Sequence, residues 1–332
     1  MQNHLDNLTK PVGSLGKLEE YAMKMARIQN KVPPIIEKKA VYVIAGDHGI
    51  NTSGVSMFPS EVTPQMVMNF VSGGAGINVL ANHCGFEVKA VDAGVAADFD
   101  NPGIIDCKVA KGTKNFHEEE AMSDSELEKC LENGKRLAKS AVADGYQLTA
   151  LGDMGISNTS SAAAMVVAAG LEADSIIDKG TGISDELLEK KRRIILESIL
   201  KHAPYSGPMD IMRKLGGFEL CTMAGFILGL KGRGVACMID GFPVTSGAYM
   251  AWLIDPSVSD YLFAGHKSKV KGHKVMLDAM GLEPIVDFNM RLGEGTGAVI
   301  GGFMVELGVR ISREMASFAS AGVTNVDNEE AY

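Results

Sequence analysis

The chain of 332 residues is 46% hydrophobic and 22% charged, a composition that is typical of globular proteins and excludes a disordered chain or a fibre. Its formal net charge of −9 argues against a nucleic-acid-binding protein, which normally carries a basic domain. The N-terminus shows no apolar leader, and the apolar runs are far shorter than the ~20 residues of a membrane span. We therefore expect a cytoplasmic protein with no membrane or nucleic-acid partner. The length of the chain predicts roughly two domains.

Both ends of the chain are predicted to be helical. After Gly16, apolar residues at helical spacing predict a helix up to about residue 30, and residues 298–321 are also mainly helical. Neither end contains a predicted strand. We therefore predict a small helical domain made of residues 1–30 and 299–325, beside a large α/β catalytic domain made of residues 31–298.

Between the two ends, short apolar runs alternate with helical patterns. Each run has the length of a strand and lacks strict alternation, which is typical of strands buried on both faces. The clearest helical stretches are residues 125–142 and 185–200, and both begin near Ser or Asp residues that can cap a helix. This order predicts a mostly parallel, Rossmann-like sheet with helices on both faces. The six predicted strands are residues 40–48, 88–94, 148–155, 235–241, 261–266 and 284–288.

Polar residues follow most of these strands. Gly-Asp, Gly-His and Asp-Gly pairs stand where the runs end, and in parallel sheets a ligand binds beyond the carboxyl ends of the strands. Each pair taken alone could be only a turn. Their recurrence in one chain favours a site assembled from several loops, and His48 and His266 could both line it.

Three glycine-rich turns each precede a predicted helix, at residues 72–76, 179–184 and 293–298. Glycine lets backbone N–H groups approach an anion, and a helix N-terminus favours negative charge, so these turns could bind phosphate or could be simple turns. Gly293, Gly295 and Ala298 match the spacing of a dinucleotide fingerprint. Only 34 residues follow, too few for the required second strand, so a nucleotide-dependent oxidoreductase is disfavoured.

Glu294 is unusual because it is a carboxylate between two glycines of such a turn. A phosphate in direct contact would repel it, so its side chain must face another part of the ligand. It could serve as a general base, provided that desolvation offsets the helix dipole and keeps its pKa from falling too low. It could equally be a glutamate that the helix dipole stabilises. The spacing alone leaves both interpretations open.

The cysteines and histidines do not suggest a metal. Five cysteines are widely spaced without a Cys-x-x-Cys pair, which predicts neither a disulfide scaffold nor a zinc site and fits a reducing compartment. The histidines do not cluster at ligand spacing, and Asp47, His48 and Asp92 only imitate a metal set. We therefore expect no metal and no cofactor.

Taken together, these motifs make the sequence similar to the nicotinate-nucleotide–dimethylbenzimidazole phosphoribosyltransferase family, which acts in cobamide (vitamin B12) lower-ligand assembly. The resemblance runs from about residue 5 to 323, and motifs in this order over this length are highly specific. The matching stretches are residues 5–16, 45–49, 61–66, 152–159, 179–182, 239–242, 264–266 and 291–298.

The resemblance implies transfer of phosphoribose from nicotinate mononucleotide to an aromatic base, giving an α-riboside phosphate. It implies that Glu294 is the proton acceptor and that Lys191 lies near the phosphate. Two loops, at Gly180 to Gly182 and at 152–158, would hold the phosphoribosyl part, and the loop at 56–58 would form a wall of the base pocket together with Gln65. The implied substrate-binding residues are Ser56, Phe58, Gln65, Asp153, Met154, Gly155, Asn158, Gly180, Thr181, Gly182, Lys191, Gly293, Gly295 and Thr296.

Two departures from the family pattern bear on the identity of the acceptor. Where the family commonly has Gly-Glu-Met-Gly-Ile-Gly, this chain has Asp153 in place of Glu and Ser157 in place of the last Gly. The departures bear on the acceptor more than on the reaction, so a phenolic acceptor remains an alternative to 5,6-dimethylbenzimidazole or a related base. A non-catalytic partner of an active paralogue is a further alternative. By family analogy we expect a homodimer, or a heterodimer with a paralogue.

Overall fold

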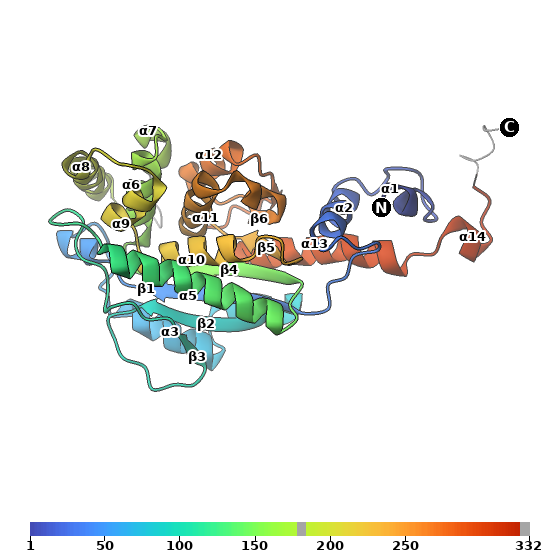
Figure 1. Ribbon diagram of the computed structural model, residues 1–332, viewed down its shortest axis with the longest axis horizontal. Coiled ribbons are helices and arrows are strands. Elements are labelled where there is room, and N and C mark those ends of the chain that lie inside the picture. Colours follow the sequence, from blue (N-terminus) through green and yellow to red (C-terminus); the bar gives the residue numbers. More distant parts are fainter. Residues whose placement is uncertain (178–183, 326–332) are drawn as a thin grey trace.

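A single parallel sheet forms the centre of the protein (Figure 1). The computed structural model describes residues 1–177 and 184–325. Its seven strands lie in the order β3-β2-β1-β4-β5-β6-β7, and every neighbouring pair is parallel. The strands are β1 (Lys39–Gly46), β2 (Glu87–Gly94), β3 (Ile104–Asp106), β4 (Leu148–Met154), β5 (Ala236–Ile239), β6 (Leu262–His266) and β7 (Pro284–Val286).

The six predicted strands are confirmed, and β3 is an addition that the sequence did not reveal. All eight residues of β1 are buried, which explains why its sequence shows an apolar run rather than alternation. Strand β3 has only three residues, is partly exposed, and pairs with β2 at one edge of the sheet. An edge strand this short leaves no periodicity to detect.

Helices cover both faces of the sheet, as predicted. On one face, α10 and α11 pack against the strands, and α5 packs against α10. On the other face, α13, α4 and α3 contact the strands. The helices are α1 (Gln2–Asp6), α2 (Lys17–Gln29), α3 (Val62–Ser72), α4 (Gly76–Cys84), α5 (Asp124–Ala143), α6 (Asn158–Ala168), α7 (Ala173–Ile176), α8 (Asp185–His202), α9 (Pro208–Leu215), α10 (Phe218–Gly229), α11 (Phe242–Ile254), α12 (Lys271–Ala279), α13 (Thr296–Glu314) and α14 (Phe318–Ala321), with 3-10 helices η1 (Gly49–Ser53) and η2 (Pro256–Asp260).

Serine caps begin the two helices that the sequence predicted most clearly. At α5, Ser123 Oγ accepts the N–H of Glu126 at 3.3 Å, and Glu126 Oε2 accepts the N–H of Ser123 at 2.7 Å. At α8, Ser184 Oγ accepts the N–H of Leu187 at 3.2 Å. Each cap satisfies backbone donors that the first turn leaves without partners. The local sequence therefore fixes where these helices start.

The two ends of the chain lie together in an arm that extends from the body (Figure 1). Helix α2 packs along α13, and the backbone N–H of Thr9 donates to the carbonyl of Ala316 at 3.0 Å. Helix α13 begins in the body and runs without a break into the arm, so the predicted boundary between residues 298 and 299 falls in its first turn. The division into a small and a large domain stays a prediction.

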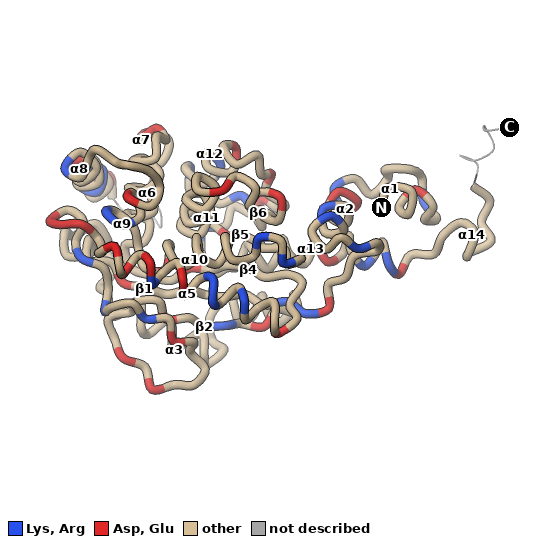
Figure 2. Tube along the Cα trace, in the orientation of Figure 1, with Lys and Arg blue, Asp and Glu red and all other residues tan. Residues whose placement is uncertain are grey.

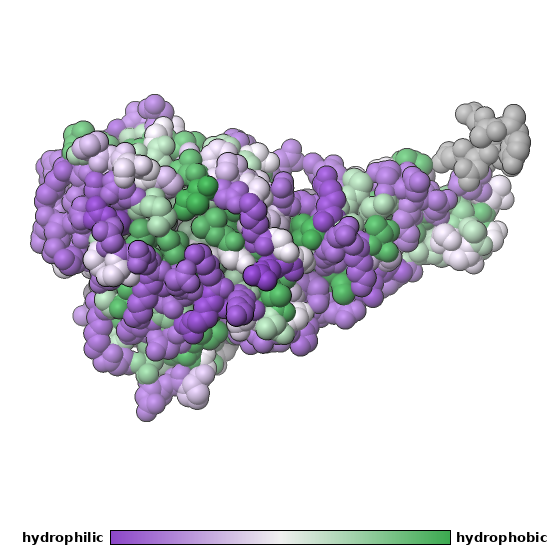
Figure 3. Space-filling model, viewed as in Figure 1, coloured by the Kyte–Doolittle hydropathy of each residue, from purple (hydrophilic) through white to green (hydrophobic). Residues whose placement is uncertain are grey.

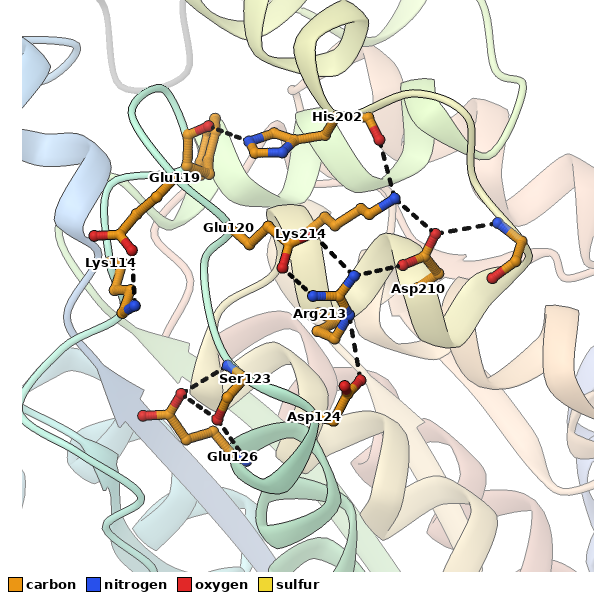
Figure 4. A network of polar contacts seen from close by, with 12 residues as sticks. Lys114, Glu119, Glu120, Ser123, Asp124, Glu126, His202, Asp210, Arg213 and Lys214 are labelled. Carbon is orange, nitrogen blue, oxygen red and sulfur yellow. Dashed lines mark hydrogen bonds and ion pairs between the residues drawn. The ribbon is translucent and has the colours of Figure 1, made fainter.

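A polar network ties α9 to the segment that precedes α5 (Figure 4). The guanidinium of Arg213 donates to Glu120 Oε1 at 2.9 Å and to Asp210 Oδ1 at 3.0 Å. Lys214 Nζ lies 2.9 Å from Asp210 Oδ2 and donates to the carbonyl of His202 at 3.0 Å. The network joins α9 both to the end of α8 and to the long connection after β3.

Charged residues are spread over the whole molecule, whereas hydrophobic groups appear on the surface in a few places. Figure 2 shows acidic and basic positions interspersed along the body and the arm. On the face shown in Figure 3, hydrophilic residues cover most of the surface, and hydrophobic groups appear between the helices of the body and along the arm. Among the described residues, no helix has the length and apolar character needed to cross a membrane.

The strand order places a ligand site. The chain moves outward from β1 to β3 in one direction and then returns to β4 on the other side of β1. The loops that leave β1 and β4 therefore diverge at their carboxyl ends and open a crevice between them. This switch point is where the predicted site residues after β4 are found.

Candidate active site

A cavity of about 260 Å³ lies beyond the carboxyl ends of the strands. Its walls come from the loops that follow β1, β4, β5, β6 and β7, so residues far apart in the sequence meet there. The predicted site residues that line it are Ser56, Phe58, Asp153, Met154, Gly155, Asn158, Lys191, Gly293 and Glu294.

Other predicted site residues do not line this cavity. Gln65 lies on α3 with its side chain exposed, and Gly295 and Thr296 lie behind Glu294 at the start of α13. Thr296 is buried, and its hydroxyl donates to the carbonyl of Gly293 at 2.8 Å, so it closes the turn that carries Glu294. The turn at residues 180–182 falls outside the described residues. The binding roles of all these residues stay predictions.

The loop at 293–295 has a constrained backbone. Three successive residues have positive φ values, +85° at Gly293, +63° at Glu294 and +89° at Gly295. Glycine adopts this region without cost, whereas for glutamate it is unfavourable and is found mainly where the surroundings enforce it. The two glycines therefore let the chain present Glu294 on a turn that an ordinary sequence would avoid.

Asp240 holds this turn from behind. Its Oδ2 accepts the N–H of Gly295 at 3.0 Å, and its Oδ1 accepts the N–H groups of Gly297 at 2.8 Å and Ala298 at 3.1 Å. Asp240 is fully buried after β5 and stabilises the N-terminus of α13 as an anion would. The Asp-Gly pair at the end of β5 indicated a site residue from the sequence, but not that its carboxylate holds the turn of Glu294.

The Glu294 side chain is buried and points to the first turn of α4. Its Oε2 accepts the N–H of Ile77 at 3.1 Å. Burial raises the pKa of Glu294 above the ordinary glutamate value, the Ile77 bond opposes this rise, and the charge of Asp240 adds to it. Glu294 is therefore a more basic carboxylate than one at the surface.

Asp153 is a second carboxyl group in the same cavity. Asn158 Nδ2 donates to its Oδ2 at 2.6 Å, while Oδ1 has no hydrogen-bond partner among the described residues. Burial raises the pKa of Asp153 to about 8, with further increases from the charges of Asp240, Glu219 and Glu294. At neutral pH Asp153 is therefore mostly a neutral acid, which distinguishes it chemically from Glu294.

The N-terminus of α6 faces the cavity from the β4 side. Asn158 and Thr159 in its first turn line the cavity, and Lys191 Nζ on α8 donates to Thr159 Oγ1 at 2.8 Å. Ser157 has a φ of +74°, and its hydroxyl donates to Asn51 Oδ1 at 2.8 Å. Backbone N–H groups at a helix start, with an ammonium beside them, form a site suited to an anion.

Two histidines that follow strands behave differently. His266 at the end of β6 lines the cavity and is 2% exposed, and Nε2 lies 3.3 Å from Asp240 Oδ1. His48 after β1 lies behind the cavity and is fully paired. The expectation that both could line the site therefore holds for His266 only.

The outer part of the cavity is apolar and open. Met57 is 56% exposed and Phe58 48% exposed, and both stand at the cavity wall with Met154 and Leu292. Such a wall suits one face of a flat aromatic ring. Within the described residues, no three His, Cys, Asp or Glu side chains come together in a way that could hold a metal ion.

Comparisons with known proteins agree with this architecture. A family model described as phosphoribosyltransferase matches residues 1–323. The nicotinate-nucleotide–dimethylbenzimidazole phosphoribosyltransferase of Geobacter sulfurreducens is 49% identical over 98% of this chain and 94% of its own length. The protein of the same name from Thermus thermophilus is 42% identical over 96% of both chains.

Solved structures extend the likeness to three dimensions. The crystal structure of CobT from Thermus thermophilus superimposes with a TM-score of 0.92 at 42% identity, over 97% of each chain. Sequence and fold thus match over almost the whole length, and the site lies at the carboxyl edge of the same sheet. The chain belongs to the nicotinate-nucleotide–dimethylbenzimidazole phosphoribosyltransferase family and is a phosphoribosyltransferase.

Proposed function

We propose that this enzyme transfers the phosphoribosyl group of nicotinate mononucleotide to a ring nitrogen of 5,6-dimethylbenzimidazole or a related base. The product would be an α-riboside phosphate used to assemble the nucleotide loop of a cobamide. The observation that carries the proposal is that buried Glu294 shares one cavity with the N-terminus of α6 and Lys191. A candidate base and a candidate anion site therefore line the same cavity.

The reaction needs little from the protein beyond placement and one proton transfer. The bond between C1′ and the pyridinium nitrogen breaks, and its electron pair leaves with nicotinate, whose ring nitrogen becomes neutral. The acceptor nitrogen forms the new bond to C1′, and the proton of the azole N–H passes to Glu294. Holding the two reactants in line can supply about 7–11 kcal/mol in favourable cases.

The burial of Glu294 fits this role. A carboxylate with a raised pKa takes a proton more readily, and a general base contributes roughly 10²–10⁴-fold. Asp153 is mostly neutral near pH 7 and does not compete for the same proton. The two carboxyl groups therefore have separate roles, with Glu294 as the base and Asp153 as a hydrogen-bonding wall of the pocket.

The phosphate of the donor would bind at the start of α6. Lys191 supplies a positive charge, and the N-terminus of α6 supplies the partial positive charge of a helix start. We extend the phosphate site to Gly180, Thr181 and Gly182 on the family resemblance alone. The nicotinate ring nitrogen leaves as a neutral group, and protein donors would bind the phosphate. The reaction therefore does not require a metal ion for either task.

A phenolic acceptor is a second candidate, and the free oxygen of Asp153 supports it. Asp153 lines the cavity and its buried Oδ1 has no partner among the described residues, so a neutral acid there could donate to a phenolic oxygen. A phenol has a pKa near 10 and must lose its proton as the C–O bond forms, so the demand on Glu294 is greater. For this reason we place the azole first.

Incubation with nicotinate mononucleotide and a panel of acceptors tests the proposal. The panel contains 5,6-dimethylbenzimidazole, benzimidazole and a phenol at equal concentration, and the products are identified by mass. We expect the N-riboside phosphate of the benzimidazoles to dominate, with release of nicotinate. A dominant O-riboside would show that the preferred acceptor is a phenol. If no acceptor leads to release of nicotinate, the proposed transfer activity is wrong.

We propose, by family analogy, that the enzyme is a homodimer. Exposed apolar residues lie on the arm, with Val12 57% exposed and Val323 50% exposed, and others lie beside the site, with Leu292 59% exposed. Surfaces of this kind suit contact with a second copy. Light scattering on the eluting protein should give twice the chain mass of 35.2 kDa, and a single-chain mass would contradict the proposal.

A further inference from the structure

A buried hydrogen-bonded chain of three side chains lies directly behind the cavity. His48 Nε2 donates to Glu219 Oε1 at 2.8 Å, and His48 Nδ1 lies 2.8 Å from Ser161 Oγ. The side chains of His48 and Glu219 are both 0% exposed. An ionised Glu219 carboxylate accepts from Nε2, and in that arrangement Nδ1 of a neutral ring accepts the hydroxyl of Ser161.

These contacts join three elements at one point. His48 lies two residues after the end of β1, Glu219 lies in the first turn of α10, and Ser161 lies near the start of α6. The start of α6 also contains Thr159, which lines the cavity and accepts from Lys191. The beginning of α6 is therefore held from one side by Lys191 and from the other by His48.

The backbone packs closely around the imidazole ring of His48. A Cβ at Gly217 would lie 2.3 Å from His48 Cε1, and a Cβ at Gly155 would lie 3.3 Å from His48 Nε2 and 2.2 Å from the carbonyl oxygen of Gly46. Gly155 lines the cavity on its other side. The imidazole therefore packs directly against the loop that faces the ligand.

We propose that His48, oriented by Glu219, is a positioning residue that sets the place of the Gly155 loop and the start of α6 for the phosphoribosyl group of the donor. The proposal rests on the proposed function and deepens it, because it names the residues that hold the part of the cavity where the donor would bind. His48 is not among the residues that line the cavity. Its effect passes through Ser161 and the Gly155 backbone.

Ser161→Ala is the cleanest variant, because it removes one hydroxyl and leaves the imidazole in place. The matched control is Ser198→Ala, which removes another buried helical serine that lies 3.1 Å from a histidine Nδ1, that of His117, away from the cavity. We expect Ser161→Ala to raise the KM and Kd for nicotinate mononucleotide about 3- to 10-fold, the net effect of one buried hydrogen bond. The acceptor KM should not change, and Ser198→Ala should change neither constant.

A second pair of variants separates positioning from folding. Glu219→Gln keeps an oxygen that can accept from Nε2, whereas Glu219→Ala removes it. Donor KM should stay near the wild-type value in the Gln variant and rise at least about tenfold in the Ala variant. Calorimetric stoichiometry with nicotinate mononucleotide reports the folded fraction of each protein.

The possible outcomes are distinct. If Ser161→Ala and Ser198→Ala leave donor KM equally unchanged, the positioning role is wrong even though wild-type transfer stands. If the Glu219 variants have a smaller folded fraction but an unchanged KM for the donor, the His48–Glu219 pair has only a structural role and the proposal fails. If wild-type protein releases no nicotinate from the mononucleotide, the proposed function and this inference fall together.

Discussion

The carboxylate of Glu294 accepts the backbone N–H of Ile77 at 3.1 Å, joining the loop that opens α13 to the first turn of α4. The side chain of Glu294 thus accepts at the N-terminus of a helix remote in sequence, while the backbone N–H of the next residue, Gly295, donates to Asp240. The bond lowers the pKa of Glu294, and burial with the charge of Asp240 raises it more. The balance leaves a buried carboxylate of raised basicity facing the cavity.

Replacing Asp240 by Asn tests how this loop is held. The amide can accept from fewer of the three backbone N–H groups that the carboxylate accepts from, and it removes a charge that raises the pKa of Glu294. We expect kcat/KM to fall about 10- to 100-fold and its acidic limb to move to lower pH. An acidic limb that stays in place would contradict the electrostatic part of this account.

Replacing Lys191 by Ala tests the anion site. The loss of a charged donor should raise the KM for nicotinate mononucleotide about 10- to 100-fold and change kcat less. Lys190→Ala, on the exposed neighbouring residue, serves as the control and should have no such effect. Wild-type enzyme that uses nicotinate riboside, which lacks the phosphate, as well as it uses the nucleotide would show that this site does not bind phosphate.

The titration of Asp153 predicts a pH-dependent change in stability. Its pKa is about 8 in the folded protein against an ordinary value of 3.8, so between these pH values the folded state binds more protons than the unfolded state. The contribution of this group to stability therefore falls as pH rises through that range. Asp153→Asn should stabilise the protein by about 1 kcal/mol or more at pH 8.5, and by less at pH 5.

Urea unfolding at the two pH values measures this effect. Asp100→Asn, at an exposed position, is the control and should show no pH-dependent gain. A gain for Asp153→Asn that is equal at both pH values, or larger at pH 5, would show that Asp153 is ionised in the folded protein.

Metal independence is a separate prediction. The described residues bring together no set of three metal-binding side chains, and the pyridinium leaves without Lewis-acid help. Exhaustive chelation should therefore leave turnover unchanged. The prediction fails if activity disappears on chelation and returns when a divalent ion is added.

The sequence predicts the sheet well because its strands are buried on both faces and leave uninterrupted apolar runs, as in β1. It misses β3 and α1, which have only three and five residues and too little pattern to detect. Asp240 shows why site residues can be missed. Its role depends on N–H groups of Gly295 and Gly297, more than fifty residues away, and only folding brings them together.

The pair formed by His48 and Glu219 illustrates the same limit. His48 follows a predicted strand, and this alone suggested that it could line the site. Glu219 lies in a helix more than 170 positions later, and no local pattern connects the two. The strand order, which brings the end of β1 beside the start of α10, decides that His48 points away from the cavity.

The base role of Glu294 is the central claim, and Glu294→Gln tests it most directly. Single turnover with nicotinate mononucleotide and 5,6-dimethylbenzimidazole should slow by roughly 10²–10⁴-fold, the range of a lost general base, with donor Kd unchanged. Glu283→Gln, at an exposed glutamate remote from the cavity, should turn over at the wild-type rate. A Glu294→Gln enzyme that is fully folded and turns over near the wild-type rate would contradict the mechanism.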